Sequence, residues 1–156
     1  NIVSPYFFHN VYDPVGTDFD QLTTSYTAVF LSNVNQDVVA LQETLCIELL
    51  CYNYGSSSNR STYVRLTDNA GTEFSTGTNQ GGSGTGTRNT ERIVHGMDET
   101  DKQIFRITWY IQGLTIGNTY TFNPQAKTSA TFNYVAAGGS YPATILRGYY
   151  LPSAGI

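Results

Sequence analysis

The chain alternates short apolar stretches with polar turns, and this pattern predicts an all-β fold. In QIFRITWYIQ and in most other apolar stretches, apolar and polar residues alternate with the two-residue period of a half-buried strand. No stretch keeps the 3.6-residue period of a helix convincingly, and clusters of Gly, Asn, Ser and Asp separate the stretches. We therefore predict about eight to ten strands arranged as an antiparallel two-sheet β-sandwich.

The predicted strands begin after the first two dozen residues. They are 25–32, 38–54, 61–67, 72–75, 91–97, 103–114, 119–123, 130–136 and 143–151. Residues 38–47 are the one segment where a short helix could interrupt them, and residues 76–90 are a Gly/Ser/Thr loop that we expect to be exposed. Residues 1–24 show no sustained period, so we assign them to an N-terminal arm or linker and residues 25–156 to a head domain.

Strand parity predicts which side chains point between the sheets. In QIFRITWYIQ the wholly apolar set is Phe105, Ile107, Trp109 and Ile111, and the outward set is Arg106, Thr108, Tyr110 and Gln112. The final strand differs, because neither of its faces is cleanly polar: Thr144, Leu146, Gly148 and Tyr150 alternate with Ala143, Ile145, Arg147, Tyr149 and Leu151. A sandwich has one interior, so the second face of this strand predicts a partner surface and hence an oligomer.

Composition and charge narrow the classes of function. Charged residues make up 13% of the chain, about half the usual share, and the surface must be built from Thr, Ser, Asn, Gln, Gly and Tyr. The net charge is -4 and the 8 basic residues are scattered, whereas a nucleic-acid site needs a clustered basic stripe. No run approaches the roughly 18 apolar residues of a membrane span. We predict neither nucleic-acid binding nor membrane insertion.

The two cysteines, Cys46 and Cys51, lie five positions apart in LCIELLCY. On one extended strand this odd spacing sends their side chains to opposite faces, roughly 16 Å apart, which is too far for a disulfide. We predict that both stay reduced as small apolar fillers; an intermolecular bridge is the alternative.

No group of residues has the pattern of a catalytic or metal site. His9 and His95 are the only histidines, and neither lies near a Ser or Cys nucleophile with an acidic partner. Two acidic clusters could offer oxygen ligands to calcium, without the spacing of an EF-hand: Asp13, Asp18 and Asp20, and Asp98, Glu99 and Asp101. We interpret them as solvated turn carboxylates and expect a non-enzymatic protein without metal or cofactor.

The C-terminal third carries a resemblance to a known group of proteins. GLTIGNTYTFNPQAKTS followed by GGSYPATILRGYYLP, within Gly113 to Pro152, resembles the C-terminal jelly-roll heads of bacteriophage fibres and capsid appendages. More distantly it resembles trimeric tumour-necrosis-factor-like and complement-type heads. The resemblance implies a jelly roll, a homotrimer, and a place on the surface of the virion. Its partners would be its own copies, other virion proteins and a host-surface glycan or protein.

Carried onto this chain, the resemblance makes a set of outward side chains the candidate trimer interface: Glu48, Tyr52, Arg106, Tyr110, Arg147, Tyr149 and Leu151. A monomeric sandwich with Tyr-rich outer faces is the alternative. CYNYGSSSNRS suggests a surface-recognition loop with Tyr54 and Asn59, for which an ordinary polar loop is the alternative.

Two classes of function remain. The first is a structural virion protein, either a fibre head or a capsid decoration; the second is a monomeric carbohydrate-binding or adhesin module of a secreted bacterial protein. The final strand, with apolar residues on both faces, favours the first class.

Overall fold

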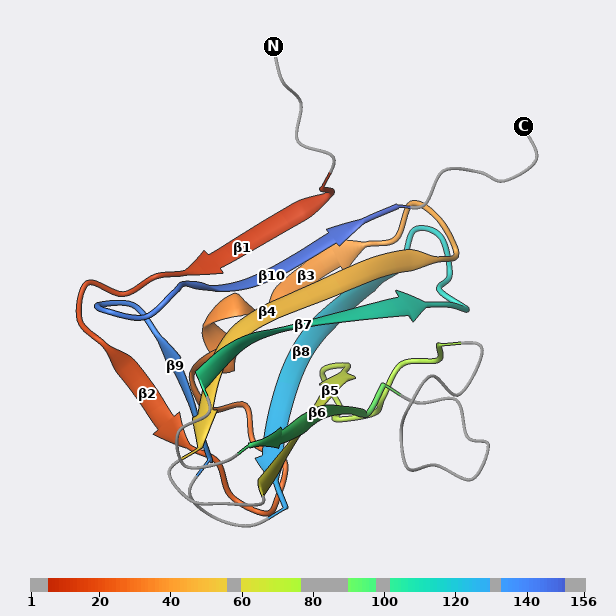
Figure 1. Cartoon of the computed structure of the whole chain (residues 1–156). Helices are drawn as coiled ribbons and strands as arrows, with labels where there is room; N and C mark the ends of the chain where they lie inside the picture. Colours follow the sequence, from red (N-terminus) through yellow and green to blue (C-terminus); the bar gives the residue numbers. More distant parts are fainter. Residues whose placement is uncertain (1–5, 56–59, 77–89, 98–101, 130–132, 151–156) are drawn as a thin grey trace.

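The computed structural model describes residues 6–55, 60–76, 90–97, 102–129 and 133–150. These residues contain ten β-strands and one short 3₁₀ helix, η1 (Figure 1). The strands form two antiparallel sheets that pack face to face. The predicted all-β two-sheet sandwich is therefore confirmed.

The first sheet is organised around one long central strand. Its members are β1 (Phe8–Tyr12), β10 (Thr144–Tyr149), β4 (Leu45–Gly55), β9 (Asn133–Ala137), β2 (Asp18–Gln21) and β7 (Lys102–Ile111). On one side β4 pairs with β7 along almost its whole length, and on the other it pairs first with β10 and then with β9. β1 pairs with β10, and β2 pairs with β9. β1 and β2 are therefore two halves of one interrupted strand, and it lies beside a second interrupted strand made of β10 and β9.

The second sheet completes the topology of a jelly roll. Its order is β3 (Gln36–Val39), β8 (Thr119–Thr128), β5 (Arg60–Thr67) and β6 (Arg92–Met97). When each interrupted strand is counted once, the two sheets have four strands each, and every connection except β5 to β6 crosses between the sheets. This arrangement is an eight-stranded jelly roll.

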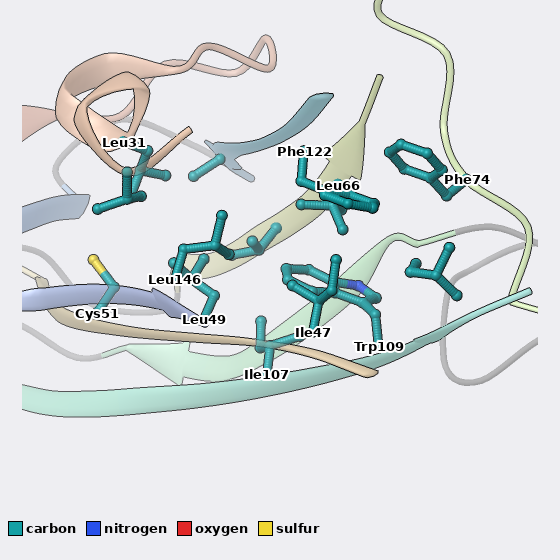
Figure 2. Packing of buried hydrophobic residues seen from close by; sticks show 14 of the residues in the cluster. Leu31, Ile47, Leu49, Cys51, Leu66, Phe74, Ile107, Trp109, Phe122 and Leu146 are labelled. Carbon is teal, nitrogen blue, oxygen red and sulfur yellow. The ribbon is translucent and has the colours of Figure 1, made fainter. Parts of the chain in front are cut away.

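The core lies between the sheets and follows the predicted parity. Trp109 and Ile47 of the first sheet lie close to Leu66 and Phe122 of the second, and all four side chains are fully buried (Figure 2). The indole Nε1 of Trp109 donates a hydrogen bond to the carbonyl of Thr90 at 2.7 Å, so its polar atom is satisfied inside the core. The inward set predicted for β7, Phe105, Ile107, Trp109 and Ile111, is buried as expected. Cys46 and Cys51 are both free and buried, which confirms that they do not pair.

The N-terminal residues contribute strands to the first sheet, where the sequence suggested an arm. Residues 8–12 form β1 and residues 18–21 form β2, and a sharp bend joins them (Figure 1). Each strand is too short, and the intervening turn around Pro14 too irregular, to show a sustained alternation. Phe8 of β1 packs over Gly148 of β10 and stacks with Phe122, 6.3 Å between ring centres.

The predicted strand at residues 25–32 is wrong. This segment makes only an isolated bridge at Thr27 and then enters η1 (Val29–Val34). Phe30 and Leu31 are both buried, which successive residues of a strand with one buried face cannot achieve. Residues 38–47 contain no helix, because β3 runs directly into bends before β4 begins. The expected strand at 72–75 is reduced to one bridge at Glu73, and residues 77–89 of the predicted loop lie outside the described residues.

Two glycines allow the turn between β9 and β10 to pack closely against the turn between β1 and β2. Gly138 and Gly139, between β9 and β10, have φ of +74° and +58°, and the Gly139 N–H donates a hydrogen bond to the Pro14 carbonyl at 3.2 Å. A Cβ on Gly138 would collide with Pro14, and a Cβ on Gly139 would collide with the Thr17 hydroxyl. No other residue type fits here without moving the β1–β2 turn.

Replacing Gly138 with alanine should therefore destabilise the fold. We expect Gly138→Ala to lower the free energy of unfolding by about 3 kcal/mol, because left-handed backbone strain and a steric clash add together. Gly113→Ala is the matched control: Gly113 has φ of +75°, but nothing lies within 4 Å of an added Cβ, so only the strain remains. Urea denaturation measures both variants, and equal losses would contradict the role given to the contact with Pro14.

Candidate assembly surface

Every strand of the first sheet contributes at least one apolar side chain to its outer face. Cross-strand pairing aligns its side chains in rows, one of which is Phe19, Ala136, Tyr52 and Ile104. The neighbouring row is Val11, Ile145, Leu50 and Arg106. Three of these apolar side chains are more than half exposed: Phe19 at 53%, Ile104 at 53% and Val11 at 52%. We call these two rows the apolar rows.

An aromatic cluster adjoins the apolar rows. Its members are Phe19, Tyr52, Tyr54, Tyr134 and Tyr141. Tyr54 stacks on Tyr134 with 4.9 Å between ring centres and 12° between planes, and Tyr52 lies 4.9 Å from Tyr141. Burial raises the pKa of the Tyr52 and Tyr54 hydroxyls. The rings thus hold one another in place while leaving Phe19 open to solvent.

A buried carboxylate anchors two arginines on the same face. Glu48 of β4 accepts a hydrogen bond from Arg106 Nη2 at 2.7 Å and another from Arg147 Nε at 2.8 Å, and its side chain is only 3% exposed. Burial raises the pKa of Glu48, but the hydrogen bonds from Arg106 and Arg147 outweigh it and hold the pKa below its ordinary value. Glu48 therefore carries its charge at neutral pH and fixes both guanidinium groups.

Tyr6 covers part of the outer face of β10. The Arg147 guanidinium lies 4.4 Å from the centre of the Tyr6 ring, and Tyr6 meets Tyr149 edge-on at 5.7 Å. A hydrogen bond with Cys46, together with burial, raises the pKa of Tyr149. Tyr6, Glu48, Arg106 and Tyr149 bound a hollow of about 240 Å³. Arg147 and Tyr149, which the sequence analysis expected a partner to cover, are thus partly covered by Tyr6 of the same chain.

Most of the predicted interface residues lie together on this face. The outer face of the first sheet holds Glu48, Tyr52, Arg106, Tyr110, Arg147 and Tyr149. Tyr54 is in β4 and belongs to the aromatic cluster, whereas it was expected in a loop. Leu151 and Asn59 lie outside the described residues.

Sequence reasoning missed Val11, Phe19, Tyr134 and Tyr141. Val11 and Phe19 belong to β1 and β2, which were too short to be predicted as strands. Tyr134 is in a predicted strand, but its position beside Tyr54 depends on pairing between segments eighty residues apart. Of these four, only Val11 in FHNVY and Tyr134 in NYVAA lie in segments whose alternation could have pointed to them.

The outer face of the second sheet is different, because polar pairs bridge its strands. Thr121 donates a hydrogen bond to Asp37 at 2.7 Å, and Arg65 donates one to Gln125 at 2.8 Å. Among the described residues, no three His, Cys, Asp or Glu side chains group as metal ligands would, and no helix is long and apolar enough to cross a membrane. The apolar face of the first sheet is therefore the stronger candidate for assembly.

Neutralising Glu48 should cost stability in a pH-dependent way. Glu48→Gln leaves Arg147, whose side chain is 17% exposed, without its ionic partner, so we expect a loss of about 3 kcal/mol at pH 7. Because the folded-state pKa lies below the ordinary value of 4.5, the contribution of Glu48 is complete above pH 4.5 and is lost as pH falls through the folded-state pKa. Urea denaturation at pH 7 and pH 3 measures this change.

Arg106→Gln is the control for Glu48→Gln. Arg106→Gln should cost less than Glu48→Gln, because the Arg106 side chain is 58% exposed and Arg147 still pairs with Glu48. A gap between wild type and Glu48→Gln that is the same at both pH values would contradict the ionic role of Glu48.

The chain is similar to solved structures of a virus at low sequence identity. No protein-family model and no curated protein sequence matches the chain. The chain is similar to a structure of the infectious bursal disease virus Gx strain, with 13% identity and a TM-score of 0.46 over 94% of this chain and 37% of that chain. It is also similar to the VP2 subviral particle of infectious bursal disease virus, with 13% identity and a TM-score of 0.43 over 95% of this chain and 38% of that chain. The chain thus spans little more than a third of the length of these neighbours.

Proposed function

We propose that this chain is a structural protein of a virus particle, which assembles with its own copies through the outer face of the first sheet. The observation that carries the proposal is the pair of apolar rows, where Val11, Phe19 and Ile104 are each more than half exposed. Exposed apolar side chains gathered on one face are typical of interaction sites. The aromatic and arginine side chains beside the rows are residue types enriched in interface cores.

The topology is compatible with a virion role, and the surface favours assembly over a monomeric module. Jelly rolls build viral capsids, but they also build lectins and cupins, so the fold by itself does not choose among them. A monomeric carbohydrate-binding module would leave the apolar rows in water with no function. The fibre-head resemblance of Gly113 to Pro152 adds a stoichiometry of three and a position on the particle surface to the proposal.

Charge is consistent with a partner of the same sequence. The outer face of the first sheet carries three basic side chains, Lys102, Arg106 and Arg147, and one acidic side chain, Glu48. The whole chain has a net charge of -4, so the acidic excess lies elsewhere on the molecule. In a three-fold ring, where this face of one copy meets a different surface of the next, carboxylates outside the face would pair with its basic excess and orient the contact.

A charge placed within the apolar rows should break the assembly without unfolding the chain. We expect wild type to sediment at the mass of three chains, and Ile104→Glu to raise the dissociation constant at least about tenfold, because it places a charged group where the contact would bury Ile104. Val39→Glu is the matched control, since Val39 is an exposed apolar residue of β3 in the second sheet. Sedimentation velocity measures the three proteins.

A wild-type chain that stays monomeric at high concentration would overturn the proposal. The same conclusion would follow if Val39→Glu dissociated the oligomer and Ile104→Glu did not. Thermal unfolding of each variant verifies that the change acts on assembly and not on folding.

A further inference from the structure

The outer face of the second sheet contains a hollow of about 420 Å³. Its lining comes from β5, β6, β8 and two adjoining segments: Thr24, Tyr63, Glu91, Ile93, Lys127, Thr128 and Ser129. A volume of this size falls within the range of small-molecule sites. The hollow lies on the side of the sandwich opposite the apolar rows, so assembly through the first sheet leaves it open.

One wall of the hollow is a cross-strand row of three side chains. Tyr63 of β5 lies directly opposite Ile93 of β6 on one side and Lys127 of β8 on the other. Ile93 is 48% exposed, although its neighbours on this face are mostly polar. An aromatic ring beside an exposed aliphatic group offers apolar contact surface, while the Lys127 ammonium lies over the Tyr63 ring, 5.3 Å from its centre.

The charged groups of the hollow are held in place before any ligand arrives. Tyr26 donates a hydrogen bond from its hydroxyl to Glu91 Oε2 at 2.6 Å, and Lys127 Nζ lies 4.0 Å from the same oxygen. Lys127 Nζ also lies 4.6 Å from the Tyr26 ring centre and 5.3 Å from that of Tyr63. A ligand would therefore pay little to order these groups.

We propose that this hollow binds a neutral pyranose unit of a glycan. The C–H face of a pyranose fits an apolar platform such as Tyr63 and Ile93, and its hydroxyls both donate and accept hydrogen bonds. Glu91 supplies an acceptor and Lys127 a donor, with the hydroxyls of Thr24 and Ser129 at the rim. Among the described residues of the lining, the charges of Lys127 and Glu91 balance, so they give no net charge that would select an acidic sugar.

The test is a titration of the ¹⁵N-labelled chain with methyl glycosides. The probes are the methyl pyranosides of glucose, galactose, mannose and N-acetylglucosamine, with methyl glucuronate as the acidic comparison. We expect saturable shifts of the Tyr63, Thr128 and Ser129 amides by at least one neutral pyranoside, with a dissociation constant of about 1 mM. Absence of saturable shifts with every neutral probe, or binding of glucuronate alone, would overturn the proposal.

Variants of Tyr63 and Lys127 test whether the hollow itself binds the sugar. Tyr63→Ala and Lys127→Met should each weaken the affinity about tenfold, as expected for a lost platform or a lost charged hydrogen bond. Thr121→Val, on the same outer face of β8 but near Asp37, should leave the affinity unchanged. Equal affinities of wild type and both hollow variants would overturn the site. Because the readout does not depend on oligomeric state, its failure leaves the assembly proposal standing.

Discussion

The pairing of β4 with three other strands is the constraint on which the rest of the structure depends. This strand joins β7 on one side and both β10 and β9 on the other, so its register fixes the first sheet. Side chains alternate along it, so Ile47 and Leu49 enter the core while Glu48, Leu50 and Tyr52 face outward. A slip of one residue would exchange the two sets and bury Glu48 among apolar side chains.

The same ladder brings distant parts of the sequence together on the outer face. Phe19 near the N-terminus and Ile104 in the middle of the chain share a row only because β2, β9, β4 and β7 lie side by side. β2 can lie beside β9 because the chain bends between β1 and β2. Gly138 and Gly139 leave room for this bend, at Pro14, to pack against the turn between β9 and β10. The two outer faces then differ: one carries the apolar rows, and the other is more polar and has a hollow that the proposed assembly would leave free.

Long, uninterrupted strands could be predicted from local sequence, and short or irregular ones could not. The alternation in β7 was enough to assign Trp109 to the core and Arg106 to the surface, because ten consecutive residues repeat the pattern. The segment at 25–32 failed, because burial of both Phe30 and Leu31 reflects η1 and its contacts with other elements. Most interface candidates were found from parity, whereas their alignment with Phe19 depends on long-range register that a single sequence does not encode locally.

The most direct test of the central claim is the solvent accessibility of individual methyl groups in the native protein at high concentration. A soluble paramagnetic probe broadens the NMR signals of methyl groups that it can approach. If copies associate through the first sheet, the Ile104 and Val11 methyls should be protected and the Val39 and Ile93 methyls, on the second sheet, should be broadened. Broadening of Ile104 and Val11 as strong as that of Val39 would contradict the account.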